Sequence, residues 1–141
     1  MPEVRWLRAS YWVGAVADAI VGVLMLFPRA GRTIYGITDF EPGPDYRYAM
    51  GLGASLMLGW TVLLLWADRR PVERSGILLI TILVIFGLAS ASAYAVMSGL
   101  IALPRMIPTW GFQAFLVALF SYSYFLTGRL PKEVTLGTAG R

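Results

Sequence analysis

The sequence predicts an all-α integral membrane protein built as a four-helix bundle, with its N and C termini in the cytoplasm. Two observations predict this class. The 141 residues are 57% hydrophobic and only 14% charged, whereas soluble domains carry about 25% charged residues. The charged residues also leave four stretches with little or no charge: 9–28, 48–67, 75–104 and 106–128. Each stretch can supply the roughly 20 mainly apolar residues that a helix needs to cross a bilayer.

Trimming the four stretches at prolines and polar edges predicts transmembrane helices near 10–27, 48–66, 76–98 and 109–127. Helices are predicted rather than barrel strands, because the stretches are continuously apolar and about twice as long as a tilted strand requires. The remaining residues are too few to build a second hydrophobic core. Residues 1–141 are therefore predicted to form a single membrane domain. Five prolines fall outside the spans, where they disturb a helix least: Pro28, Pro71, Pro104, Pro108 and Pro131.

The first apolar stretch follows Arg5 and Arg8, as the core of a signal peptide would, but no small-residue cleavage site follows it. We therefore expect a retained membrane anchor. The loop 28–47 that comes next is predicted to be extracytoplasmic. Its basic start, Arg29–Gly36, has the pattern of a short helix lying in the membrane interface.

The orientation follows from the distribution of lysine and arginine. The N-terminal tail, the loop between the second and third spans and the C-terminal tail together hold 8 of these residues, and the other two loops hold 4. The positive-inside rule places the more basic side in the cytoplasm. We therefore expect a multi-pass protein of the inner or plasma membrane. The same bias explains the net charge of +4, so no nucleic-acid partner is expected.

The composition also narrows the chemistry. The chain contains no cysteine and no histidine, which removes thiolate chemistry, the commonest metal ligand and the usual general base. No nucleophile elbow, phosphate-binding loop or metal-ligand spacing is present. We therefore predict no catalytic residue, no metal site and no cofactor, and we do not expect an enzyme.

Asp18 is the one acidic residue inside the predicted spans. Gly14, Asp18 and Gly22 recur at every fourth position, so they share one helix face. Small residues at this spacing let another helix approach closely, which indicates that Asp18 points into a helix–helix contact. Similar ladders of small residues occur on the second and third spans, and we expect them to pack around the first: Gly51, Ser55 and Gly59, and Gly87, Ala91, Ala95 and Gly99.

Further polar side chains lie between the predicted midplane and the outer surface: Ser55, Ser90, Tyr94 and Gln113. Arg47 and Arg105 are predicted at the outer rim above them. With Asp18 as its floor, this set predicts an outward-opening polar pocket that binds a ligand or a proton.

Three interpretations of this set remain open. Asp18 could be protonated, or hydrogen-bonded to Ser55, Ser90 or Tyr94, and merely fix the register of the helices. It could line a cavity that exchanges a proton or takes up a small amphipathic or cationic molecule, because intramembrane carboxylates commonly mark such pathways. The bundle could instead be a non-catalytic accessory or lipid-binding subunit.

Four helices with one acid in the first resemble, in plan, the small multidrug-resistance transporters, although the first loop is longer than the connections of that family. We therefore predict binding or transport of a small amphipathic or cationic molecule, with the accessory subunit as the alternative. The expected partners are membrane lipids and either further copies of the chain or a larger membrane complex.

Overall fold

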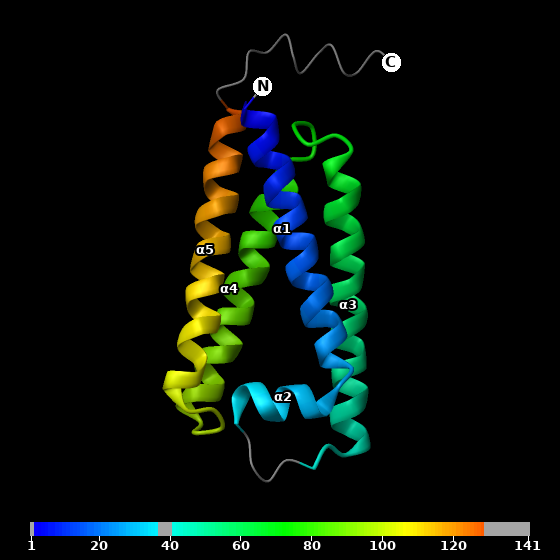
Figure 1. Ribbon diagram of the computed structural model, residues 1–141, viewed down its shortest axis with the longest axis vertical. Helices are drawn as coiled ribbons and strands as arrows, with labels where there is room; N and C mark the ends of the chain where they lie inside the picture. The colour runs from blue at the N-terminus through cyan, green and yellow to red at the C-terminus, as the bar shows by residue number, and fades with distance from the viewer. Residues whose placement is uncertain (1, 37–40, 129–141) are drawn as a thin grey trace.

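The computed structural model describes residues 2–36 and 41–128, and these residues form helices and no strands. Four helices are long and one is short (Figure 1). The all-α class predicted from the sequence is thereby confirmed. The helices are α1 (Pro2–Met25), α2 (Pro28–Tyr35), α3 (Pro44–Asp68), α4 (Gly76–Met97) and α5 (Leu103–Thr127).

Three helices in the described part of the chain are long and apolar enough to cross a membrane. They are α1 over Val4–Met25, α3 and α4, and each contains most of a predicted span. Helix α5 is as long as α3, but Arg105, Gln113 and several prolines and hydroxyl-bearing residues make it less apolar. Its membrane crossing therefore stays a prediction.

Two helix boundaries differ from the predicted spans in a way that matters. Helix α1 begins at Pro2, so Arg5 and Arg8 belong to the helix and not to a tail. Helix α5 begins at Leu103 and contains Pro108, which the predicted span excludes. Both differences have one reason: charge and proline mark the limits of an apolar segment, but a helix can continue beyond it. Near the start of α5, Pro108 removes only one backbone hydrogen bond.

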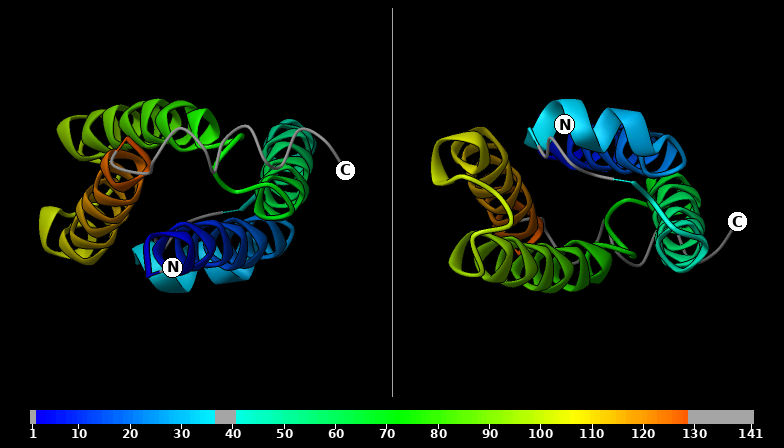
Figure 2. Two further views of the ribbon diagram at one scale, coloured as in Figure 1. Left: turned by 90° about the horizontal axis from the view of Figure 1, so that it is seen from above. Right: turned by 90° about the horizontal axis from the view of Figure 1, so that it is seen from below.

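The long helices are arranged as two pairs, α1 with α3 and α4 with α5, and contacts between α1 and α5 join the pairs (Figures 1 and 2). The start of α1, the end of α5 and the turn between α3 and α4 lie at one end of the molecule, whereas α2 lies across the opposite end (Figure 1). We call these the turn end and the α2 end. The helix predicted at Arg29–Gly36 is thus present as α2.

The main buried cluster lies toward the turn end. It draws on the first half of α1 and α4 and on the second half of α3 and α5, so all four long helices meet there. Toward the α2 end, most large apolar side chains face outward, as expected for lipid contact. The buried members of the cluster are Leu7, Tyr11, Ala15, Leu64, Ala67, Leu78, Ile85, Leu116 and Phe120.

Side chains of α1 and α3 also fix the turn at residues 69–75. The Tyr11 hydroxyl donates a hydrogen bond of 3.1 Å to the carbonyl of Pro71. The guanidinium carbon of Arg74 lies 3.3 Å from the centre of the Trp66 ring, which is a cation–π contact. Arg74 also donates to the Trp66 carbonyl, which accepts a weak backbone hydrogen bond of 3.4 Å from Arg69 at the end of α3.

The ladders of small residues behave differently on different helices. A Cβ atom at Gly14 would lie 3.0 Å from both Leu64 and Phe120, and one at Gly22 would lie 3.2 Å from Leu58. The predicted close approach along α1 is thus present. A Cβ at Gly51, Gly59 or Gly87 would meet nothing within 4 Å, so these glycines of α3 and α4 do not pack around α1 as expected. The small residues of α3 that do approach α1 are Gly53 and Ala54, which the predicted ladder does not include.

Candidate functional site

Asp18 lies on α1 just beyond the buried cluster. Its residue is half-buried, and the cluster's last member on α1 is Ala15. Gly14 and Gly22, one turn before and one turn after Asp18, contact neighbouring helices. Asp18 therefore occupies the α1 face that approaches the rest of the protein, beyond the buried cluster and between two close contacts of α1.

The Asp18 carboxyl has no hydrogen-bond or ion-pair partner within the described residues. The three side chains expected as partners are engaged or placed elsewhere. The hydroxyls of Ser55 and Ser90 donate to the carbonyls of Gly51 and Phe86, four residues earlier in their own helices. Tyr94 is 74% exposed. The register-fixing hydrogen bonds of the first interpretation are therefore not formed.

Gln113 is a second polar side chain without a partner. Its Oε1 is buried and accepts no hydrogen bond in the part of the chain that the structure describes. Gln113 precedes Leu116 and Phe120 by three and seven residues, so it shares with them the face of α5 that enters the core. A buried carbonyl oxygen without a donor costs about 1–3 kcal/mol, so this oxygen is an available acceptor.

Asp18 and Gln113 lie at similar depth on neighbouring helices. The side chain of Phe120 on α5 meets α1 at Gly14. From that contact toward the α2 end, Asp18 lies about 6 Å along α1 and Gln113 about 10 Å along α5, at about 1.5 Å per residue. The two groups are therefore within about one helical turn of the same level. Both present oxygen acceptors, and no described side chain donates to either of them.

Arg47 and Arg105, predicted at the rim, both lie at the α2 end. Arg47 is in the first turns of α3 and lines a pocket with Pro28 and Arg29 of α2. The guanidinium of Arg105 lies against Gly36, where an added Cβ would overlap it. Gly36 ends α2 with a φ of 67°, a left-handed conformation that glycine adopts readily. A cation is favourable at this helix end because carbonyl dipoles point toward it.

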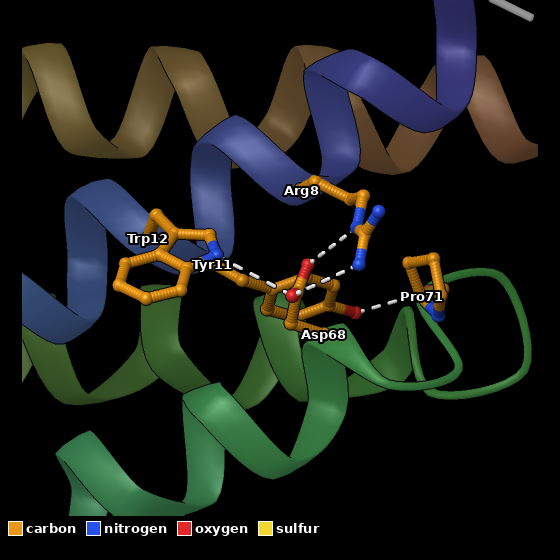
Figure 3. Close-up of polar contacts among 5 residues, drawn as sticks. All are labelled: Arg8, Tyr11, Trp12, Asp68 and Pro71. Carbon is orange, nitrogen blue, oxygen red and sulfur yellow. Dashed lines mark hydrogen bonds and ion pairs between the residues drawn. The ribbon is translucent and has the colours of Figure 1, made fainter.

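The strongest polar cluster lies elsewhere, at the turn end, and the sequence analysis did not single it out (Figure 3). Arg8 donates to the Asp68 carboxylate from Nε at 3.0 Å and from Nη2 at 3.4 Å. Trp12 Nε1 donates to the same carboxylate at 3.3 Å. The Asp68 side chain is only 12% exposed, whereas that of Arg8 is 59% exposed. This cluster ties α1 to the end of α3, and all three donors serve one acid.

The sequence contained a weak signal for this cluster. Arg8 and Trp12 are four residues apart, so they share a face if the helix extends far enough to include both. The predicted first span begins at residue 10, which separates them. At the same turn, Glu73 pairs with Arg70 at 3.2 Å on the surface.

Asp18 and Gln113 present oxygen atoms that can take part in hydrogen bonds. An anionic or neutral carboxyl and an amide oxygen can accept hydrogen bonds, and a carboxylate can balance a positive charge. Within residues 2–36 and 41–128, no group of three or more acidic, histidine or cysteine side chains is placed to hold a metal ion. No protein-family model, curated protein or solved structure matches the chain.

Proposed function

We propose that this chain is a multi-pass membrane protein that binds a small cationic amphiphile through Asp18. In this proposal α1, α3, α4 and α5 cross the membrane as a four-helix bundle, with the turn end in the cytoplasm. The length of α5 and its packing beside α4 and α1 support its inclusion. Among the described residues, five arginines lie toward the turn end and four toward the α2 end, which favours this orientation: Arg5, Arg8, Arg69, Arg70 and Arg74 against Arg29, Arg32, Arg47 and Arg105. Arg129, Lys132 and Arg141 lie outside the described residues.

One observation carries the proposal: the acid in the first apolar helix has no donor in the described protein. Placing an aspartate near the centre of a membrane helix costs about 2.5–3.5 kcal/mol on insertion scales. Asp68 offsets its burial with three hydrogen bonds, but Asp18 has no such compensation. A ligand with a positive charge and N–H donors would supply it.

Gln113 favours a ligand that donates more than one hydrogen bond. Its buried Oε1 also has no donor, and it lies close to the level of Asp18. A primary ammonium group has three N–H donors, enough for both oxygens. Ser55, Ser90 and Tyr94 are not needed for this arrangement.

The experiment compares three probes with the same eight-carbon chain: octylammonium, octyltrimethylammonium and octanol. The purified full-length protein is placed in phosphatidylcholine nanodiscs, and binding is measured by calorimetry against empty nanodiscs. We expect saturable binding of octylammonium, weaker binding of octyltrimethylammonium, which has no N–H donor, and none of octanol. Asp18→Asn should weaken octylammonium binding about tenfold or more, which corresponds to about 1.4 kcal/mol.

The matched control is Glu73→Gln, which also removes one carboxylate but on the exposed surface of the turn end. This variant should bind octylammonium as the unmodified protein does. Equal binding by the Asp18→Asn protein, equal loss in both variants, or no saturable binding by the unmodified protein would each refute the proposal.

A further inference from the structure

The α2 end contains a pocket of about 430 Å³ that the Asp18 proposal does not use. Helix α2 contributes Arg29 and Arg32, and the first turns of α3 contribute Arg47. Pro28 fixes the start of α2, where its missing N–H is not needed. Glu41 and Pro42, just before α3, complete the lining.

The pocket has an excess of positive charge that the described protein does not neutralise. Three guanidinium groups and one carboxylate line it, and none of the three arginines forms an ion pair with a described residue. At the turn end, by contrast, two arginines, Arg8 and Arg70, each pair with an acid. Guanidinium groups are well suited to bind phosphate oxygens, often through two parallel hydrogen bonds.

A second pocket adjoins the first, and apart from Arg47 the residues that line it are apolar; we call it the apolar pocket. It has a volume of about 270 Å³ and shares Pro28 and Arg47 with the basic pocket. Its other lining residues are Met25 and Leu26 at the end of α1, and Met50 and Gly51 on α3. The absence of a side chain at Gly51 leaves this part of the α3 surface open. An anionic group in the basic pocket would therefore have an apolar channel beside it.

The position of α2 fits the edge of a membrane. The helix lies across the ends of the long helices (Figure 1), and apolar side chains around it are exposed: Leu26 at 53%, Phe27 at 59% and Ile34 at 48%. Helices with arginines on one side and exposed apolar residues on the other lie in the interface between headgroups and acyl chains. The basic pocket would then be at headgroup level and the apolar pocket below it.

We propose that this double pocket binds one anionic phospholipid. The phosphate lies among Arg29, Arg32 and Arg47, and the first part of an acyl chain lies against Met25, Leu26 and Met50. With Glu41 included, the lining carries a formal charge of +2, which suits a headgroup with a single net negative charge. The apolar pocket selects the lipid over a free phosphate, because only the lipid fills both parts. This inference does not depend on Asp18.

The experiment counts lipids that remain bound to the intact protein. The full-length protein is equilibrated with equal amounts of phosphatidylglycerol and phosphatidylcholine that carry the same acyl chains, and native mass spectrometry measures the bound lipid. We expect retention of one phosphatidylglycerol in preference to phosphatidylcholine. The double variant Arg29→Gln/Arg47→Gln should lower this preference about tenfold or more, a loss of two charge-assisted contacts.

The matched control is Arg69→Gln/Arg70→Gln, which removes the same charge at the turn end and should keep the preference. Circular dichroism checks that both double variants retain their helices. An equal loss in the two variants would show general charge attraction and overturn the proposal, as would undiminished preference in Arg29→Gln/Arg47→Gln. Displacement of the lipid by millimolar glycerol 3-phosphate would also overturn it, in favour of a site for soluble phosphates. Asp18→Asn should leave the preference unchanged.

Discussion

Two acidic side chains lie beside or on α1 in opposite situations: Asp68, which comes from the end of α3, and Asp18, which belongs to α1 itself. Toward the turn end, Asp68 reaches α1 and receives hydrogen bonds from Arg8 and Trp12. Further along α1, Asp18 is half-buried and no described residue donates to it. Both acids belong to long apolar helices, so both have to offset the loss of hydration.

The difference separates an acid that stabilises the contact between α1 and α3, Asp68, from one that contributes no described polar contact, Asp18. The Asp68 cluster lies next to the buried core that joins all four long helices, where satisfied polar groups fix the position of one helix against another. Asp18 lies where that core ends. Polar groups are paired beside that core, whereas the Asp18 carboxyl and the Gln113 amide oxygen, both nearer the α2 end, have no described partner.

The largest expected effect comes from making the same substitution at both acids. Asp68→Ala removes the acceptor of three hydrogen bonds, one of them from the indole of Trp12, and should lower the free energy of unfolding by about 2–3 kcal/mol. The exposure of Arg8 limits the loss, because water can solvate its guanidinium. Asp18→Ala should change the free energy of unfolding by less than about 0.5 kcal/mol, or raise it, because no described hydrogen bond or ion pair is lost.

Unfolding in mixed detergent micelles with increasing dodecyl sulfate, followed by far-ultraviolet circular dichroism, measures both values. If Asp18→Ala destabilises the protein as much as Asp68→Ala does, Asp18 also contributes to the stability of the fold. The claim that only Asp68 of the two acids stabilises the protein would then be wrong.

A second, smaller effect tests the packing between the two acids. Gly14 lies on α1 one turn from Asp18, and an added Cβ would be 3.0 Å from Leu64 and Phe120. Gly14→Ala should therefore lower the free energy of unfolding by about 1–2 kcal/mol through overpacking.

Gly87 of α4 is the matched control, because an added Cβ there meets nothing within 4 Å. Gly87→Ala should be neutral or stabilise the helix by up to about 1 kcal/mol. The same loss in both variants would mean that the α1 contact is not specially tight.

The sequence predicted the positions of the helices better than the contacts between them. Charge-free stretches located α1, α3 and α4, and the basic segment after α1 predicted α2. Three ladders of small residues look equivalent in the sequence, yet only the ladder on α1 has close neighbours. The same holds for bulky residues: Phe120 is fully buried, whereas Phe125 is 71% exposed. In a membrane the residues that face lipid are as apolar as those that face the protein core. Hydrophobicity therefore does not distinguish the inner face of a helix from its outer face.

The Asp68 cluster was missed for a related reason. Its donor and acceptor lie 60 residues apart, and the charges that marked the ends of the predicted spans placed both in loops. The pairing becomes visible only when α1 extends back to Arg8 and α3 forward to Asp68. Asp18 was found because it interrupts an apolar stretch, a property of the local sequence. Its lack of a donor depends on the positions of three other helices and could not be predicted.

The smallest expected effect concerns the contact that joins the two helix pairs. Ser10 of α1 and Ser123 of α5 are fully buried, and their hydroxyls lie 2.7 Å apart. Nearby, Ser123 also approaches the carbonyl of Trp6 at 3.4 Å, and the rings of Trp6 and Tyr122 meet edge to face at 5.8 Å. Interhelical hydrogen bonds in membranes contribute about 0.6 kcal/mol on average and up to about 1.7 kcal/mol. Because neither hydroxyl is exposed to solvent, we expect a coupling energy of about 1 kcal/mol in a double-mutant cycle of Ser10→Ala and Ser123→Ala.

Thr61 supplies the control for this cycle. Its hydroxyl already bonds the Met57 carbonyl of its own helix at 3.0 Å and reaches Ala15 of α1 only at 3.4 Å. Thr61→Ala combined with Ser10→Ala should therefore be additive within about 0.5 kcal/mol. Equal coupling in both cycles would mean that the effect spreads through α1 rather than through the serine pair. Coupling confined to Ser10 and Ser123 would show that this buried pair stabilises the contact between α1 and α5, in contrast to Asp18, which has no described polar partner.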